Sequence, residues 1–197
     1  MVELAMRRPP AVPAKDWLKA LPPAARLVLH GDAQARAAAA PIWGAGFSEA
    51  ACRATVEGTR ATLWLGPDEY LLIDSAGGSD TAPDTAALRN EPQIPAASAL
   101  ERALTGIPHA LVDISHRQFA LEVSGPHAGA ILNGACPLDL DLREFPIGMC
   151  TRTVFAKADI VLWRTRADAF HVEVWRSFAG YVTGLIGEIG REFYGAG

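Results

Sequence analysis

The sequence predicts an α+β fold in which one unit of strand, helix, hairpin and helix occurs twice. Leu-Trp pairs stand at matching places in the two copies, at Trp64 and Trp163, which are 99 positions apart. The strands that begin the copies contain Leu27 and Leu121, which are 94 positions apart. Because this offset is nearly constant and close to half the chain, the pattern indicates an internal duplication.

Each copy begins with a strand and a helix. In "ARLVLHGDAQARAAAAP" an apolar strand leads to Asp32, a favourable helix N-cap, and Pro41 is expected to stop the helix that follows. In "FALEVSGPHAGAILNGAC" a strand with alternating apolar residues leads to Pro126 at the first helical position. This second helix is expected to run through Leu132.

A hairpin and a second helix complete each copy. The segments 60–74 and 159–174 both have the pattern strand, turn, strand. Ser98 and Glu101 have the spacing of a capping box at the start of the first closing helix. Ser177 is expected to open the second, which carries apolar residues at helical spacing at positions 178, 181, 182, 185, 186 and 189.

The predicted organisation is a proline-rich tail followed by a single duplicated domain. The tail covers residues 1–23 and the domain covers 24–197, with halves of about 24–110 and 111–197. The segment 75–98 is rich in Gly, Pro, Ser and Asp and is expected to be a surface loop, the best candidate for disorder.

The tail contains one apolar anchor, "DWLKAL". Trp17, Leu18 and Leu21 could form one helical turn of apolar surface between the proline groups. That turn could pack on its own domain or on another protein, and the sequence favours neither.

Composition excludes several classes of function. The net charge of −4 and the lack of a basic cluster argue against nucleic-acid and membrane partners. The N-terminal segment "MVELAMRRPPAVPAK" has prolines where a signal peptide has an apolar stretch, so a cytoplasmic location is expected. Cys52, Cys136 and Cys150 lack C-x-x-C spacing and are expected to be inert buried thiols.

The stretch "LVDISHRQFALEVSGP" contains Asp113, Ser115 and His116, the strongest candidates for a catalytic site. Adjacent residues on an extended strand point to opposite faces, so a Ser-His pair is disfavoured there. The alternative is a turn between strands in which Asp113 or Ser115 bonds backbone N–H groups. No H-x-H or H-x-x-x-H spacing indicates a metal site, and each histidine is expected to be structural, with His171 on a solvent-facing side of its strand. No catalytic, cofactor-binding or metal-binding residue is therefore assigned.

The blocks "DISHRQ", "CPLDLDLREFPIG" and "LWLGPDEYLLI" resemble the gamma subunit family of heterotetrameric sarcosine oxidases. The resemblance covers about residues 24 to 197. That family is related to the folate-binding domain of the glycine-cleavage aminomethyltransferase, which implies a duplicated α+β fold.

The chain departs from the aminomethyltransferases where their folate chemistry lies. Their long Gly-rich hairpin turn with paired aspartates is reduced here to "FAKADIVLW", and only Asp159 remains near that place. "IGMCTR" shares only its Gly and Cys with the K-G-C-Y block of a second folate-binding relative. The resemblance therefore implies no folate residue on this chain.

The resemblance implies a non-catalytic assembly subunit with alpha, beta and delta partner subunits. The complex would oxidise sarcosine to glycine with production of hydrogen peroxide, and would pass the one-carbon unit to tetrahydrofolate or release formaldehyde. FAD, FMN, NAD and folate are expected on the partner subunits, and none on this chain. The alternative function is a stand-alone folate-binding one-carbon protein of the aminomethyltransferase type.

Overall fold

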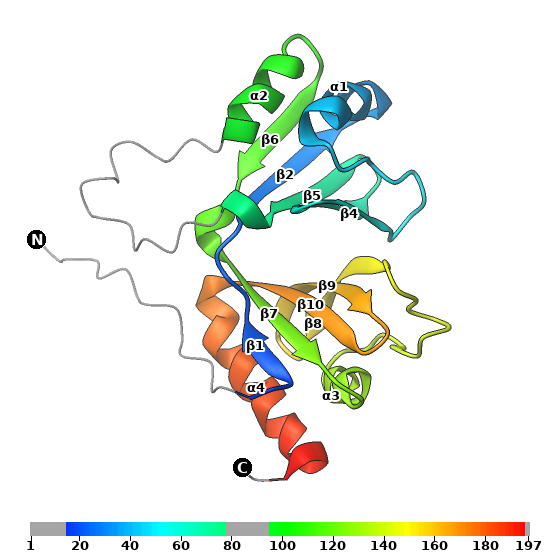
Figure 1. The fold of residues 1–197 in the computed structure, drawn as a ribbon, viewed down its shortest axis with the longest axis vertical. Coiled ribbons are helices and arrows are strands. Elements are labelled where there is room, and N and C mark those ends of the chain that lie inside the picture. The colour runs from blue at the N-terminus through cyan, green and yellow to red at the C-terminus, as the bar shows by residue number, and fades with distance from the viewer. Residues whose placement is uncertain (1–14, 78–94, 196–197) are drawn as a thin grey trace, which may run out of the picture. The chain divides into compact units, whose positions relative to one another are not determined.

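The computed structural model describes residues 15–77 and 95–195, which divide into two compact units. The first unit contains residues 22–116 and 147–152. The second contains the described part of the chain up to Leu21 together with residues 117–146 and 153–195. Each unit consists of a five-stranded sheet with two α-helices (Figure 1).

In the first unit the strands lie in the order β3-β4-β5-β2-β6. Neighbouring strands are antiparallel throughout this sheet. The elements are β2 (Ala25–Gly31), α1 (Ala33–Trp43), β3 (Ala54–Glu57), β4 (Arg60–Gly66), β5 (Glu69–Asp74), the short 3-10 helix η1 (Ser75–Gly77), α2 (Pro95–Ala103) and β6 (His109–Asp113).

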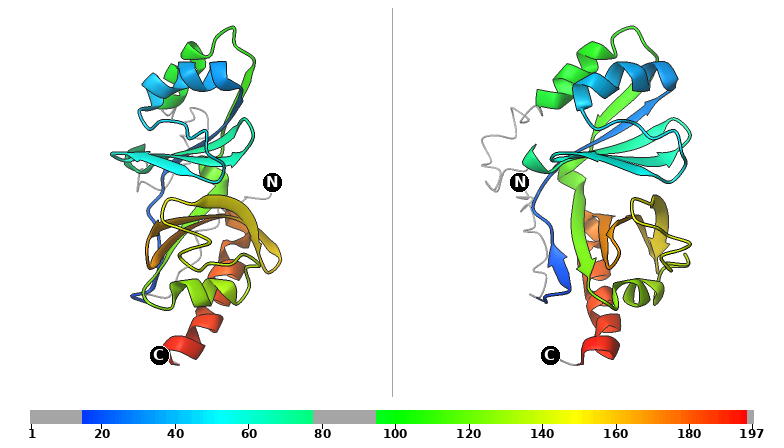
Figure 2. Two further views of the ribbon diagram at one scale, coloured as in Figure 1. Left: turned by 90° about the vertical axis from the view of Figure 1, so that its right-hand side faces the viewer. Right: turned by 45° about the vertical axis from the view of Figure 1, so that its right-hand side comes forward.

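In the second unit the order is β1-β7-β10-β9-β8. Helix α4 runs along one face of this sheet (Figure 2). The elements are β1 (Leu18–Ala20), β7 (Gln118–Ser124), α3 (Ala128–Asn133), β8 (Cys150–Phe155), β9 (Ala158–Arg166), β10 (Ala169–Trp175) and α4 (Arg176–Tyr194), and the 3-10 helix η3 (Ser115–Arg117) precedes β7.

The predicted duplication is confirmed, because the two sheets have the same strand order. The spatial order β3-β4-β5-β2 corresponds to β8-β9-β10-β7. Along the chain, helices α1 and α2 follow β2 and β5, and helices α3 and α4 follow the corresponding strands β7 and β10. Both hairpins lie where the sequence predicts them. The fold is therefore the expected α+β class.

The fifth strand of each sheet comes from the other copy, which the sequence did not predict. β1 immediately precedes β2 in the chain but pairs with β7, and β6 immediately precedes β7 but pairs with β2. Each copy therefore supplies one edge strand to the sheet of the other.

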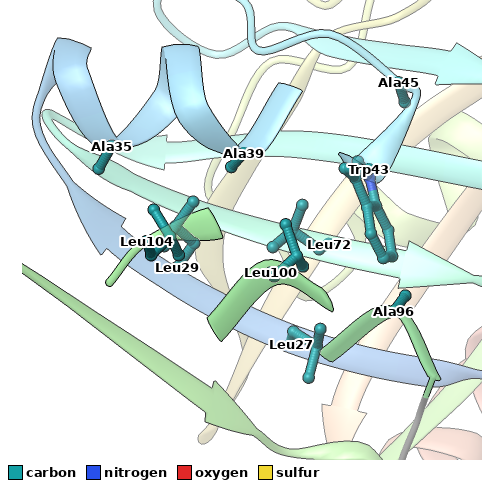
Figure 3. Close-up of a cluster of buried hydrophobic side chains, with 10 residues drawn as sticks. All are labelled: Leu27, Leu29, Ala35, Ala39, Trp43, Ala45, Leu72, Ala96, Leu100 and Leu104. Carbon is teal, nitrogen blue, oxygen red and sulfur yellow. The ribbon is translucent and has the colours of Figure 1, made fainter. Parts of the chain in front are cut away.

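Helices α1 and α2 cover one face of the first sheet and form an apolar core there (Figure 3). Gly31 allows the first turn of α1 to lie against the end of β2, because a Cβ atom at this position would lie only 2.4 Å from the Cβ of Ala35. The small side chains of Ala35 and Ala39 face the sheet and bring α1 close to it. The cluster consists of Leu27, Leu29, Ala35, Ala39, Trp43, Ala45, Leu72, Ala96, Leu100 and Leu104.

The start of α1 is as predicted, but its end is not. Asp32 is the N-cap, and its carboxylate accepts hydrogen bonds from the N–H groups of Gln34 and Ala35 at 2.9 and 3.1 Å. The helix continues past Pro41 to Trp43, so the expected stop at Pro41 is wrong. Burial of Trp43 stabilises this last turn, and Gly44, with a φ of 91°, ends the helix.

The expected starts of α2 and α4 are also wrong. α2 begins at Pro95, so Ser98 lies inside the helix and is not its N-cap. Proline is favoured at a first helical position because its missing N–H costs no intrahelical hydrogen bond there. α4 begins at Arg176, with Trp175 in the N-cap position. Of the predicted loop 75–98, residues 78–94 lie outside the described residues.

The anchor around Trp17 is a strand and not the expected helical turn. Leu18 pairs with Val123 and Ala20 with Leu121, so β1 extends the second sheet. Trp17 is 8% exposed, and its ring stacks on that of Tyr194 in α4 at a centroid distance of 5.1 Å. Residues 15–21 of the expected tail therefore pack on the second unit of the same chain.

Candidate functional site

The segment from Asp113 to Ser115 follows the pairing of β6 with β2 and adds hydrogen bonds to β2. Main-chain pairing continues to the N–H of Ile114, which donates to the carbonyl of Arg26 at 2.9 Å. The Ser115 hydroxyl oxygen then accepts the N–H of Arg26 at 2.8 Å, in the place of a strand carbonyl. Asp113 Oδ1 accepts both the N–H and the hydroxyl of Ser115, at 2.8 and 2.6 Å. The predicted turn with side-chain to backbone hydrogen bonds is therefore confirmed.

Ser115→Ala is expected to lower the free energy of unfolding by about 1–3 kcal/mol. The buried Arg26 loses the acceptor of its N–H group, and an unpaired buried donor carries this cost. Urea denaturation of the isolated chain measures the change, with Ser115→Thr as the control that keeps the hydroxyl. In an assembled oxidase, turnover should stay within about tenfold. A loss of several orders of magnitude with assembly intact would contradict the structural role of Ser115.

His116 is exposed and has no hydrogen bond to Ser115 in the described structure. The neighbouring Arg117 lies over the ring of Trp175, 5.4 Å from its centroid. Trp175 itself is 48% exposed. The structure therefore does not pair Ser115 as a nucleophile with His116 as its base. The contact between Arg117 and Trp175 joins η3 to the exposed start of α4.

His171 does not lie on a solvent-facing side of its strand, so that expectation is wrong. Its side chain is 12% exposed, and Nε2 lies 2.7 Å from Oε1 of Glu173, whose side chain is fully buried. The ring also packs against Trp163 on β9 at 5.6 Å. Sequence alternation missed this pair because it separates the two faces of a sheet but does not show which face is covered.

The other described histidines have separate local contacts. The ring of His109 bonds the carbonyl of Ile107 at 2.7 Å, and this hydrogen bond raises the pKa of His109. His127 stacks on Phe193 of α4. Within residues 15–77 and 95–195, no three His, Cys, Asp or Glu side chains gather in a way that could hold a metal ion.

Glu69, on β5, is the centre of a charged cluster that the sequence did not predict. The Arg152 guanidinium donates to both carboxylate oxygens, with Nη1 2.7 Å from Oε2, and His30 Nε2 lies 3.4 Å from Oε1. The hydrogen bond from Arg152 holds the pKa of Glu69 below its ordinary value of 4.5, against the opposing effect of burial. Glu69 therefore stabilises the fold as a carboxylate.

The contribution of Glu69 to stability is expected to depend on pH. A lowered folded-state pKa gives stability that is present above the unfolded-state pKa and is lost as the pH falls through the folded-state value. Wild type should therefore lose more unfolding free energy than Glu69→Gln between about pH 5 and about pH 3. Denaturation at several pH values measures this, and equal losses in the two proteins would contradict it.

The cysteines differ in burial. Cys150 is fully buried, and burial raises the pKa of its thiol to about 12, so it is protonated and unreactive at neutral pH. Cys136 is also buried. Cys52 is only partly buried, with a φ of 58°, so the expectation of three buried thiols is wrong for Cys52.

The hairpin between β8 and β9, at which the resemblance led us to look for folate carboxylates, is short. Strands β8 and β9 are joined by only Ala156 and Lys157, and Ala156 has a φ of 51°. Asp159 follows on β9 and is exposed. Asp159 is the only carboxylate of the β8–β9 hairpin.

No described helix is both long enough and apolar enough to span a membrane.

The apolar surface of α4 was predicted only in part. Its apolar residues do follow helical spacing, but Phe178 and Tyr181 are 40% and 43% exposed. The sequence signal for this exposed surface is the absence of charge from residues 177–187.

A protein-family comparison matches residues 30–189 to the family described as "Sarcosine oxidase, gamma subunit family". Among curated proteins, a sarcosine oxidase subunit gamma from Corynebacterium sp. (strain P-1) is 33% identical over 139 residues, which are 71% of this chain and 60% of that protein. The corresponding subunit from an Arthrobacter sp. is 38% identical over 116 residues, which are 59% of this chain and 49% of that protein. The chain thus spans about half to three fifths of these relatives.

Solved structures similar to the chain include the following two. Heterotetrameric sarcosine oxidase from Corynebacterium sp. U-96, in complex with pyrrole 2-carboxylate, matches with a TM-score of 0.76 and 27% identity, over 91% of this chain and 85% of that chain. Aminomethyltransferase T of the glycine cleavage system from Bartonella henselae matches with a TM-score of 0.57 and 15% identity, over 86% of this chain and 44% of that chain. The second similarity concerns the fold alone.

Proposed function

Because this chain belongs to the sarcosine oxidase gamma subunit family, we propose that it is a non-catalytic assembly subunit of a heterotetrameric sarcosine oxidase. The complex would convert sarcosine, oxygen and water to glycine, formaldehyde and hydrogen peroxide, or pass the one-carbon unit to tetrahydrofolate. The partners would be alpha, beta and delta subunits, and FAD, FMN, NAD and folate would be bound by them.

The observation that carries this proposal is the family match over residues 30–189, together with a structural match over 91% of the chain. The non-catalytic role is supported by local geometry. The Ser115 hydroxyl is engaged by Asp113 and by the main chain of Arg26, and the Cys150 thiol is buried and protonated. Serine and cysteine can act as nucleophiles, but the Ser115 hydroxyl is used in hydrogen bonds that stabilise the fold and the Cys150 thiol is buried in it.

The test is co-expression of a tagged chain with the proteins encoded by its genomic neighbours. We expect the tag to recover a complex whose native mass equals the sum of four different subunits. The complex should produce hydrogen peroxide in the presence of sarcosine, and the isolated chain should produce none.

The competing function is a stand-alone folate-binding one-carbon protein of the aminomethyltransferase type. Calorimetric titration of the isolated chain with tetrahydrofolate and with FAD distinguishes the two functions. Tight one-to-one binding of either compound, with no partner recovered by the tag, would contradict the assembly proposal.

A further inference from the structure

The middle of α4, from residue 177 to residue 187, lacks the charges that the solvent-facing side of a helix normally carries. Residues 177–187, "SFAGYVTGLIG", contain no charged side chain. Only part of this segment is buried within the chain, at Ala179, Val182, Thr183 and Ile186. A helix of a globular protein normally places charged or polar residues opposite its buried stripe. This uncharged outward side therefore has the composition of a covered surface.

Exposed aromatic side chains concentrate on the same helix. Phe178 and Tyr181 lie one turn apart, and Trp175 precedes them at the N-cap. In the described part of the chain, every large aromatic side chain of the exposed class lies between Trp175 and Tyr194. Trp, Tyr and Arg are the residues that most often dominate binding energy at protein interfaces, and Arg117 packs on Trp175 here.

Two glycines of the uncharged segment 177–187 make no close packing contact in the described chain. A Cβ atom added at Gly184 or Gly187 would have no atom within 4 Å. Glycine inside a helix costs about 1 kcal/mol relative to alanine, so two such residues weaken α4 without any contact in return. A close approach by the backbone of another chain would give them a function.

The charge at the start of α4 indicates which kind of chain would cover this side. Trp175 provides no side-chain cap, the first turn has no acidic residue, and Arg117 and Arg176 lie at this end. Uncapped N–H groups and arginines favour a carboxylate from outside. Along α4 the first acidic residue is Glu188, which is paired with Arg191.

We propose that the exposed side of the uncharged segment 177–187 of α4, together with Trp175, is the surface on which this chain docks to another subunit of the oxidase. This inference rests on the proposed function and adds the location and chemistry of the contact. The matching surface of the partner is apolar, has carboxylates where it meets the start of α4, and approaches closely at Gly184.

Gly184→Arg tests the docking surface without disturbing the fold. Arginine is a good helix former and has open space at this position, so the isolated chain should keep its thermal midpoint or gain about 2–4 °C. Assembly with the co-expressed subunits should weaken by about a hundredfold or more, because an unpaired charge would be buried in an apolar contact. Ala37→Arg, at an exposed position of α1, is the matched control and should assemble as wild type does.

The outcomes separate this inference from the proposed function. Recovery of wild type and Ala37→Arg complexes, with loss of the Gly184→Arg complex, supports the docking surface. Equal recovery of all three overturns the docking surface and leaves the assembly function standing. Failure of wild type to assemble overturns the assembly function, and the docking surface with it.

A photo-crosslinker identifies what covers α4. The full chain with p-benzoylphenylalanine in place of Tyr181 is co-expressed with its neighbours and irradiated, and Leu142, which is 46% exposed, is the control position. We expect position 181 to crosslink to another oxidase subunit. A crosslink to a second copy of this chain, or to residues 1–14 or 78–94 of the same chain, would overturn the inference.

Discussion

Trp17→Ala is expected to lower the free energy of unfolding by about 3–5 kcal/mol, the usual cost of removing a buried tryptophan. Trp17 stacks on Tyr194 and fills the space left by Gly190, where a Cβ atom would lie 2.0 Å from the indole Cη2. The next residue, Leu18, is 1% exposed and begins β1. Loss of the indole therefore removes the contact that holds β1 against α4.

Urea denaturation of the isolated chain measures the effect of Trp17→Ala. Two further variants separate packing at this contact from a general effect on α4. Gly190→Ala should also destabilise the chain, because its Cβ would overlap the indole ring, whereas Gly184→Ala should be neutral or stabilising. A change of less than about 0.5 kcal/mol for Trp17→Ala would contradict the proposed anchoring of β1, since changes of that size are typical of surface sites.

Trp43→Ala is expected to have a similar cost, about 3–5 kcal/mol, in the first unit. Trp43 is fully buried between α1 and the sheet, among Leu72, Leu100 and Ala96 (Figure 3). The Arg60 guanidinium lies 5.1 Å from its ring centroid and also donates to its carbonyl at 2.8 Å. Alanine would leave a cavity of nearly the size of an indole, which this helix and sheet cannot close without moving.

Trp43→Phe is the matched control for that prediction. The indole N–H of Trp43 is buried and has no hydrogen-bond partner among the described residues, so phenylalanine loses ring volume but no hydrogen bond. We expect Trp43→Phe to cost clearly less than Trp43→Ala in the same denaturation experiment. Equal costs would show that the position depends on the indole itself and not on filled volume.

The predictions from sequence succeeded where the signal is local. Both hairpins and the Asp32 cap depend on residues that are neighbours in the chain, and the structure contains each of them. The duplication was visible because these local patterns recur at a nearly constant offset. The turn at Asp113 and Ser115 succeeded for the same reason, because its hydrogen bonds to Asp113 span two residues. The family resemblance, carried by contiguous blocks of residues, was confirmed by the match over residues 30–189.

The predictions failed where distant contacts compete with local preference. Pro41 did not end α1, because the buried indole of Trp43 stabilises one more turn. The failure at Ser98 has a local cause instead, because α2 begins three residues earlier at Pro95, a residue favoured at the first helical position. His171 alternates with apolar residues as an exposed residue does, yet it pairs with a buried Glu173.

The sequence by itself determined that this chain repeats one α+β unit, and which family it resembles. The predicted unit of strand, helix, hairpin and helix lacks one strand of each observed copy, since β3 and β8 precede the hairpins. Only the tertiary structure decided that β1 and β6 are exchanged between the copies, because strand pairing depends on which edge is free in space and not on which strand is next in the chain. It also decided which side of α4 is buried. Apolar spacing predicted one stripe, but the sheet is covered mainly by Ala179, Val182 and Ile186, so Phe178 and Tyr181 remain exposed on its flank. The reason is geometric, since a sheet contacts a narrower arc of a helix than the full arc of its apolar residues.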